Sequence, residues 1–278
     1  MFNAQQKEFF EQNGYVVAEQ LFTAEEVEFY LDYYMKLRDH EKVRKDDRFS
    51  TATSADPLVQ YPRLMMMHRW DNTTLDWLLD PRINQCMTTL LDREPYAVQT
   101  MFYFKPPQAR GQALHQDNYY LRVQPGTCIA AWMALDDCEI DNGCLQVVPG
   151  SHNWPTLCTT KADTTQSFTD VTVPVPADYP ATPVLMRAGD VLFFNGSLVH
   201  GSFPNRTTDR FRRSLIGHYI EGDSQQVARA YHPVLRMDGS SVEVGASEKG
   251  GQCGVWVTQD GQPVLEVSGY EVVEKATE

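Results

Sequence analysis

The sequence lacks the features that mark several large classes of protein. Its six cysteines show no C-x-x-C spacing, which argues against a zinc ribbon or a thioredoxin-like redox site. No apolar run reaches the roughly 20 residues that a membrane-spanning helix needs. Basic residues are also few, since 24 Lys and Arg stand against 37 Asp and Glu, a net charge of −13. We therefore expect no nucleic-acid partner and no anionic-membrane partner, because both select basic surfaces.

The N-terminus shows no basic segment followed by an apolar one, so no secretory signal is indicated. The cysteines are Cys86, Cys128, Cys138, Cys144, Cys158 and Cys253. We expect them to be free thiols in a reducing compartment, and we expect a cytoplasmic protein. The sequence does not indicate the oligomeric state.

The 278 residues, 42% of them hydrophobic and 22% charged, suit one soluble domain with a substantial core. Residues 1–95 are predicted to form a helical part and residues 96–221 a β-rich core. Residues 222–278 are predicted to be an extension with a hairpin around Asp260-Gly261. Helices first and many short strands afterwards are typical of a β-sandwich or barrel with helices packed outside.

Local signals place the main elements. Thr23 and Glu26 form a capping box that predicts a helix to about Arg38. A second helix is predicted over residues 74–91, broken near Asp80-Pro81, and a mobile loop over residues 40–54. The predicted strands cover residues 96–104, 114–120, 127–134, 145–148, 184–186, 191–194 and 212–220.

The segment His115-Gln116-Asp117 places an imidazole and a carboxylate two residues apart. If it is a β-strand, both side chains lie on one face and bind one metal ion together. We expect the third ligand to be His200, which follows the apolar residues 191–194. Two histidines and a carboxylate on one face of an octahedron are typical of non-haem Fe(II) with open positions for oxygen chemistry.

Arg212 and Ser214 follow His200 after a short loop. On a strand they would share a face, and a guanidinium group beside a hydroxyl suits one end of a dicarboxylate. The neighbouring Arg213 is the alternative for this role. The combination predicts an iron site with an acidic co-substrate beside it.

These residues belong to a series of short motifs in a fixed order. The motifs are Met101-Phe102-Tyr103-Phe104-Lys105-Pro106-Pro107, Leu114-His115-Gln116-Asp117, Ala131-Trp132, Asp141-Asn142-Gly143-Cys144-Leu145, Val148-Pro149-Gly150-Ser151-His152, Gly189-Asp190-Val191, His200-Gly201-Ser202 and Phe211-Arg212-Arg213-Ser214. In this series, which spans roughly residues 14–220, the sequence resembles the phytanoyl-CoA dioxygenase-like family of Fe(II)- and 2-oxoglutarate-dependent oxygenases.

The resemblance implies a mainly β fold with flanking helices and a double-stranded β-helix (jelly-roll, cupin-like) core. It implies His115, Asp117 and His200 as the metal ligands and catalytic centre. It also implies that Arg212 binds the distal carboxylate of 2-oxoglutarate, with Ser214 assisting. Met101, Trp132 and Ser202 match positions that line the co-substrate pocket.

The implied activity is hydroxylation of an unactivated C–H bond of a small-molecule substrate, with release of succinate and CO₂. Fe(II) is the implied cofactor, and 2-oxoglutarate and O₂ are the implied co-substrates. Gln99 and Tyr103 alternate with Met101 along a predicted strand, so they are candidate substrate contacts. Family members act on acyl-CoA esters, amino-acid-like solutes, phosphonates and natural products, and the sequence does not choose among them.

Several other polar residues have simpler interpretations. We expect His152 to be a structural loop histidine and Lys105 to be structural, while His218 either supports the metal ligands or is a satisfied core group. Two alternative functions stay open. One is a catalytically silent barrel that binds a ligand, which has no evident need for the three ligands and Arg212 together. The other is a cupin-type metalloenzyme without 2-oxoglutarate, which leaves Arg212 unexplained.

Overall fold

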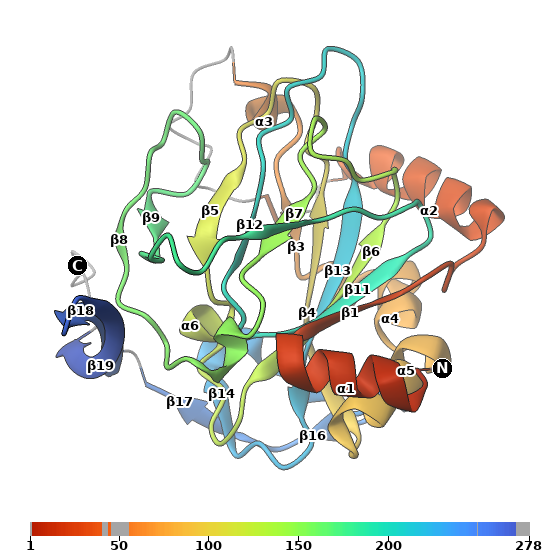
Figure 1. The fold of residues 1–278 in the computed structure, drawn as a ribbon. Helices are drawn as coiled ribbons and strands as arrows, with labels where there is room; N and C mark the ends of the chain where they lie inside the picture. The colour runs from red at the N-terminus through yellow and green to blue at the C-terminus, as the bar shows by residue number, and fades with distance from the viewer. Residues whose placement is uncertain (1, 41–43, 46–55, 249, 271–278) are drawn as a thin grey trace, which may run out of the picture.

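A computed structural model describes residues 2–40, 44–45, 56–248 and 250–270 (Figure 1). The helices are α1 (Ala4–Asn13), α2 (Ala24–Leu37), α3 (Pro57–Gln60), α4 (Asn72–Leu78), α5 (Pro81–Leu91) and α6 (Asn118–Leu121), with 3-10 turns η2 (Met67–Arg69), η3 (Ser151–Asn153) and η4 (Arg229–Tyr231). None of the described helices is long and apolar enough to cross a membrane.

Most strands belong to two sheets. A nine-stranded sheet has the order β1 (Tyr15–Ala18), β11 (Val191–Asn195), β6 (Cys128–Ala134), β13 (Ser214–Glu221), β4 (Pro95–Tyr103), β15 (Val234–Leu235) and β16 (Ser241–Val242), with β3 (Leu64–Met65) and β2 (Arg44–Lys45) joined to β4. A four-stranded sheet has the order β10 (Thr182–Val184), β7 (Leu145–Val147), β12 (His200–Ser202) and β5 (Gln112–His115). Three two-stranded ribbons pair β8 (Thr160–Lys161) with β9 (Val171–Thr172), β14 (Gln226–Ala228) with β17 (Gly245–Ser247), and β18 (Gln252–Gln259) with β19 (Gln262–Tyr270).

The helical signals read from the sequence are confirmed. Thr23 and Glu26 form the predicted capping box, in which the Thr23 backbone N–H donates to Glu26 Oε2 at 2.8 Å and Glu26 N–H donates to Thr23 Oγ1 at 3.3 Å. The predicted break lies where α4 ends and α5 begins. Asp80 caps α5 through Arg82 N–H, and Pro81 takes the first helical position, where its missing N–H is harmless.

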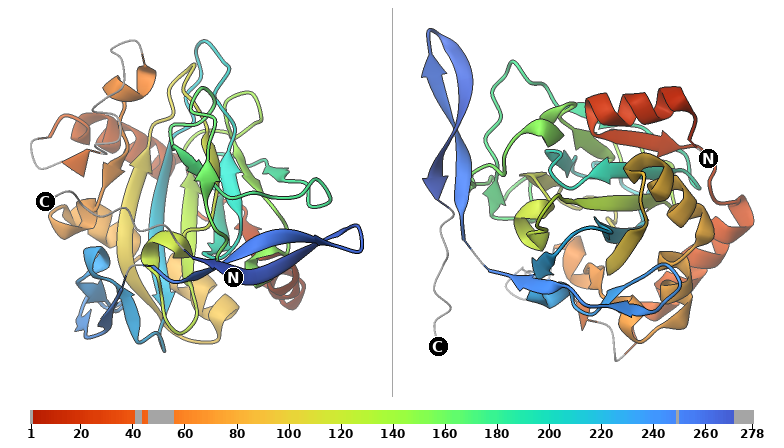
Figure 2. Two further views of the ribbon diagram at one scale, coloured as in Figure 1. Left: turned by 90° about the vertical axis from the view of Figure 1, so that its left-hand side faces the viewer. Right: turned by 90° about the horizontal axis from the view of Figure 1, so that it is seen from below.

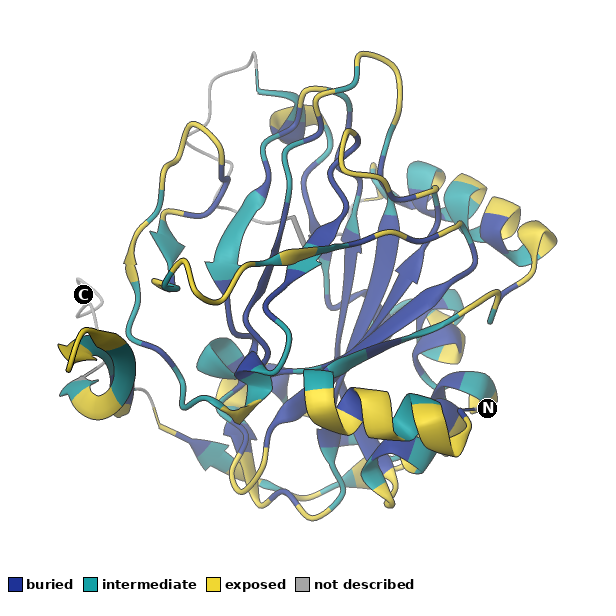
Figure 3. Cartoon of the chain, viewed as in Figure 1, coloured by how far each residue is buried: buried dark blue, intermediate teal, exposed yellow. Residues whose placement is uncertain are grey.

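The central strands of the nine-stranded sheet, such as β6 and β13, are buried on both faces, and their successive side chains alternate between two packed clusters. On β6, Ala131 and Met133 pack in the cluster that contains Trp77 of α4 and Ile83 of α5. Trp132, between them, packs in a second cluster with β7 residues of the four-stranded sheet. Figure 3 shows the resulting continuous burial of these strands and the exposed outer faces of the helices. The predicted mainly β core with helices outside it is confirmed.

The second cluster places the four-stranded sheet against the inner face of the larger one, as expected for a double-stranded β-helix (Figures 1 and 2). Within the small sheet, His200 on β12 lies directly opposite His115 on β5. Two residues that are 85 positions apart in the chain therefore become cross-strand neighbours at the edge of the inner space.

Three predicted strand boundaries are wrong. Residues 114–120 are not one strand, because β5 ends at His115 and the helical turn α6 begins at Asn118. Arg212 precedes β13, which begins at Ser214, and the strand predicted at residues 184–186 ends at Val184. The loop predicted at residues 40–54 lies mostly outside the described residues, although residues 44–45 form β2.

The C-terminal hairpin is confirmed, with Val257 of β18 opposite Val264 of β19. Figure 2 shows it projecting beside the main body. The predicted division into three parts stays a prediction. The nine-stranded sheet takes β1 from the N-terminal part and β15 and β16 from the extension, so both parts contribute to the main sheet.

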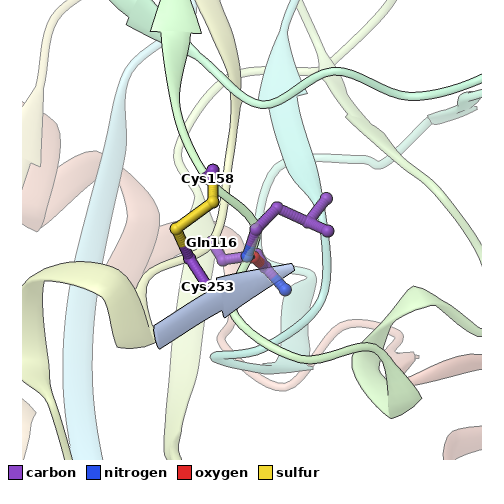
Figure 4. Close-up of a disulfide and its surroundings, with 4 residues drawn as sticks. Gln116, Cys158 and Cys253 are labelled. Atoms are coloured by element: carbon purple, nitrogen blue, oxygen red, sulfur yellow. A yellow bond between two sulfur atoms is a disulfide. The ribbon is translucent and has the colours of Figure 1, made fainter. Parts of the chain in front are cut away.

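The expectation that all six cysteines are free thiols is wrong for one pair. Cys158 and Cys253 form a disulfide that joins the segment before β8 to the start of the hairpin (Figure 4). The two residues are 95 positions apart, and no spacing rule connects them, so only the fold brings them together. Cys86, Cys128, Cys138 and Cys144 are free and buried.

Candidate active site

The three predicted metal ligands meet at one end of the inner space. His115, Asp117 and His200 are all buried, and each offers a ligand atom within 4.8 Å of the others. His115 Nε2 lies 3.5 Å from Asp117 Oδ1, and His200 Nε2 lies 3.7 Å from Asp117 Oδ2. These separations leave room for one ion between the three side chains.

Both histidines are oriented by backbone carbonyl groups. His115 Nδ1 donates to Ala113 O at 2.9 Å and His200 Nδ1 donates to Leu198 O at 3.0 Å. A carbonyl only accepts, so Nδ1 must carry the proton in both rings and Nε2 keeps its lone pair. This second contact is the one that fixes the ring angle of metal-binding histidines. The chain therefore presents two neutral Nε2 donors toward Asp117.

The protonation states also suit a metal. Burial lowers the pKa of His200 to about 4, helped by the adjacent His115, so the ring is neutral at pH 7. Burial alone would raise the pKa of Asp117, but the nearby His200 and His218 lower it further than burial raises it, and the carboxylate stays ionised. Two neutral imidazoles and one carboxylate leave the site with a net negative charge that a divalent cation offsets.

The contact between His115 and Asp117 does not arise from a shared strand face. Asp117 has helical backbone angles and stands at the start of α6. The chain turns there because Asn118 N–H donates to Gly196 O and Leu121 N–H donates to Asp117 O. The turn brings the carboxylate back toward His115.

Gln116, between these two ligands, anchors the segment to two other parts of the chain. Its Oε1 accepts from Leu157 N–H at 2.8 Å, and its Nε2 donates to Ser197 O at 2.7 Å and to Pro155 O at 3.3 Å. Figure 4 shows this amide beside the disulfide, whose Cys158 directly follows Leu157. Gln116 therefore links the metal-binding segment to Ser197, three residues before His200, and to Leu157, next to the disulfide.

The ligands line a cavity of about 400 Å³. All of the predicted site residues except Ser214 also line it, namely Gln99, Met101, Tyr103, Trp132, Ser202 and Arg212. Other lining residues are Arg63, Met65, Gln112, Tyr120, Leu121, Leu145, Phe194, Ile216, His218 and Tyr231. The volume lies in the lower half of the range usual for small-molecule sites.

Arg212 is the notable charge in this cavity. The residue is 2% exposed, and its guanidinium lies over the Trp132 ring at 5.0 Å and donates to Ser214 Oγ at 2.9 Å and to Gly143 O at 3.1 Å. Among the residues that the structure describes, no carboxylate lies within ion-pair distance of it. A buried cation without an anion is costly, so the site is prepared for an anionic ligand.

The neighbouring arginines are occupied elsewhere. Arg213 pairs with Asp136 at 2.7 Å, and Arg210 pairs with Glu139 at 2.6 Å. Neither lines the cavity. The geometry therefore favours Arg212 over Arg213 as the co-substrate arginine.

Lys105 supports the same end of the cavity, in keeping with the structural role expected for it. Its Nζ donates to Ser202 Oγ at 2.8 Å, to Gly143 O at 3.2 Å and to Phe203 O. Burial, and then the charge of Arg212, lower the pKa of Lys105 well below its usual range. Since Lys105 and Arg212 share Gly143 O, the lysine fixes the loop against which the arginine rests.

Two further polar contacts reach the ligands. Gln112 Nε2 donates to the Nε2 lone pair of His115 at 3.0 Å, so this amide must release the nitrogen when a metal binds. His218 contacts Asp117 Oδ2 at 2.9 Å. His152, in contrast, is a structural histidine, as expected: its ring contacts Glu11 O and packs against Gly14, which has no space for a Cβ atom. The His218 contact agrees with the alternative in which this histidine supports the metal ligands, whereas the Gln112 contact was not foreseen.

The residues present fit an Fe(II) ion with 2-oxoglutarate. Two neutral imidazoles and a carboxylate form the donor set of a facial triad, and an unpaired buried arginine lies in the same cavity.

Comparison with known proteins agrees with this geometry. The family model "Phytanoyl-CoA dioxygenase (PhyH)" matches residues 10–214. "Phytanoyl-CoA dioxygenase 1" of Oryza sativa subsp. japonica is 27% identical over 249 residues, covering 78% of this chain and 88% of the rice protein. "Phytanoyl-CoA dioxygenase, peroxisomal" of Rattus norvegicus is 26% identical over 239 residues, covering 81% of this chain and 70% of the rat protein.

Among solved structures, the epimerase SnoN in complex with Fe³⁺, α-ketoglutarate and nogalamycin RO has a TM-score of 0.65. It is 20% identical, and the match covers 94% of this chain and 97% of that one. At 20% identity this similarity shows a shared fold and does not show a shared reaction. Fold, donor set and family model agree that this chain belongs to the phytanoyl-CoA dioxygenase (PhyH) family of Fe(II)- and 2-oxoglutarate-dependent oxygenases.

Proposed function

We propose that this protein hydroxylates an unactivated C–H bond of a small molecule, converting 2-oxoglutarate and O₂ to succinate and CO₂. The observation that carries the proposal is that the His115, Asp117 and His200 donors and the unpaired Arg212 line one cavity. Bound iron supplies the oxidation when it is in place. The chain itself supplies the ligand geometry, the co-substrate contacts and a largely buried pocket.

The co-substrate end of the pocket is the Arg212 end. A guanidinium donates two parallel hydrogen bonds to a carboxylate, and Ser214 places a hydroxyl group beside it. The hydroxyl of Ser202, which also lines the cavity, is held by Lys105. Met101 and Trp132 give that end apolar walls. A dicarboxylate held there by its distal end points its other end toward the triad.

The candidate substrate contacts, Gln99 and Tyr103, are uncharged. Gln99, 3% exposed, lines the cavity and makes no side-chain hydrogen bond within the described part of the chain. We propose it as a substrate contact, since its amide lines the cavity and is free to hydrogen-bond a ligand there. Tyr103 is the weaker candidate because its hydroxyl already contacts Arg63 and Gln112.

The test is conversion of 2-oxoglutarate to succinate by the purified protein with Fe(II) and O₂, with a panel of compact polar compounds as substrates. The proposal expects succinate and a hydroxylated product in equal amounts, and neither from Asp117→Ala protein that remains folded. Binding of a ligand without any conversion of 2-oxoglutarate would favour the catalytically silent barrel. Turnover that does not need 2-oxoglutarate would favour the cupin-type alternative.

A further inference from the structure

His218 is a third histidine at the metal-binding triad. It lies on β13, opposite Gln99 on β4 and Ala130 on β6, so it occupies the floor of the cavity between two neighbouring strands. Its side chain is 2% exposed. Nothing in its strand position requires a polar residue, because Ile216 and Ile220, two positions before and after it, are apolar and buried.

The ring makes one hydrogen bond, and that bond goes to a metal ligand. His218 Nε2 lies 2.9 Å from Asp117 Oδ2. The 2.9 Å contact with a carboxylate oxygen is an N–H···O hydrogen bond, so Nε2 carries the proton and is not itself a metal donor. The other ring nitrogen, Nδ1, is buried and has no hydrogen-bond partner among the residues that the structure describes. The histidine therefore tolerates an unsatisfied atom in order to contact Asp117.

Asp117 has little else to hold its carboxylate in place. It begins the four-residue helix α6 but makes no side-chain capping bond there. Within the described residues, the bond from His218 is the one hydrogen bond that its side chain accepts from a donor nearer than 3.0 Å. Without this bond, the carboxylate can rotate about the Cβ–Cγ bond, because Asp117 lies outside any strand.

We propose that His218 is a positioning residue that holds Asp117 so that one carboxylate oxygen faces the metal. With Oδ2 engaged by His218, Oδ1 is the oxygen left for the ion. The inference rests on the proposed function. An ion held by these three protein donors would keep open positions for the co-substrate and O₂. An aspartate that bound the ion through both oxygens would occupy one of these open positions. Restraint of Oδ2 by His218 would therefore keep that position available to the co-substrate.

The test compares two variants in metal titrations. His218→Gln keeps an N–H donor near the position of Nε2, whereas His218→Phe keeps an aromatic ring and loses the donor. We measure Co(II) affinity anaerobically, the Co(II) visible spectrum as a report of coordination, and 2-oxoglutarate affinity of the Co(II) form. Loss of such a supporting contact typically weakens metal binding by about 10- to 100-fold.

We expect His218→Phe to bind Co(II) about 10- to 100-fold more weakly, to change the spectrum and to bind 2-oxoglutarate less well, with His218→Gln close to the unaltered protein. His152→Gln, at the distant structural histidine, controls for loss of any histidine, and thermal melting of the apo proteins checks folding. Unchanged Co(II) and 2-oxoglutarate binding in a folded His218→Phe protein would overturn the inference and leave the proposed function intact. Failure of the unaltered protein to bind Co(II) would instead overturn the proposed function.

Discussion

Arg212 and Arg213 are neighbours in the chain but have opposite environments. Arg213 is neutralised by Asp136 at 2.7 Å, whereas Arg212 is buried beside the cavity with only neutral acceptors. A residue's partners, more than its type, decide which arginine is available to a ligand. From the sequence alone the two were hard to separate, because both lie near the expected start of a strand.

Arg212→Ala is therefore expected to weaken 2-oxoglutarate binding by about 10- to 100-fold, the effect of losing charge-assisted hydrogen bonds of about 1.5–3 kcal/mol. Arg213→Ala is the matched control, which removes the ion pair with Asp136 and leaves 2-oxoglutarate binding close to normal. Isothermal titration of the metal-loaded proteins measures both. Equal weakening in the two variants would argue against the assignment of Arg212.

His68 gives a pH prediction at the same scale. Its ring is buried against Thr100, and burial, then the charge of Arg69, lower its pKa from 6.5 to about 4. Between these values the unfolded chain binds a proton at this position and the native protein does not. The free energy of unfolding should thus fall as the pH drops from 6.5 to 4, by at most about 3 kcal/mol from this residue. Urea titrations of His68→Gln should show a shallower pH dependence, and an unchanged slope would contradict the assignment.

At the scale of elements, the metal-binding segment shows where sequence patterns succeed and fail. The strands of the nine-stranded sheet follow from β-branched and aromatic runs between turn residues, and their prediction is largely confirmed. The change from β5 to α6 between His115 and Asp117 was missed because a backbone bond from Asn118 to Gly196 directs it. His115 and Asp117 lie together as expected, although the shared strand expected for them was wrong.

The disulfide is the second element-scale correction, and it is testable. Cys158→Ser/Cys253→Ser protein should unfold more readily by about 2–4 kcal/mol, since the bond closes a loop of 95 residues. A reductant should lower the melting temperature of the unaltered protein and leave that of the double variant unchanged. An unaltered protein that is insensitive to the reductant would contradict this. The cytoplasmic location stays a prediction, and mass measurement of the cysteines in protein from its native source tests it.

On the scale of the whole molecule, two sheets and a helical layer place a chemical site in a small buried space. The helices cover one face of the nine-stranded sheet, so the other face is left to the four-stranded sheet and the cavity between them. The sequence predicts this architecture and the triad through hydrophobic patterns and family motifs. It does not predict the contact of Lys105 with Ser202, and it leaves two roles open for His218, because these contacts join positions 97 and 101 residues apart that only the closed sheets bring together.

The central claim is that one cavity binds Fe(II) and 2-oxoglutarate together, and the most direct test is their mutual effect on affinity. Anaerobic titration of 2-oxoglutarate into the protein, with and without Fe(II), measures it. We expect Fe(II) to tighten 2-oxoglutarate binding, with a visible charge-transfer absorption for the complex, and both effects to vanish in His200→Ala protein. Binding of 2-oxoglutarate that is independent of Fe(II), or no binding of either, would contradict the account.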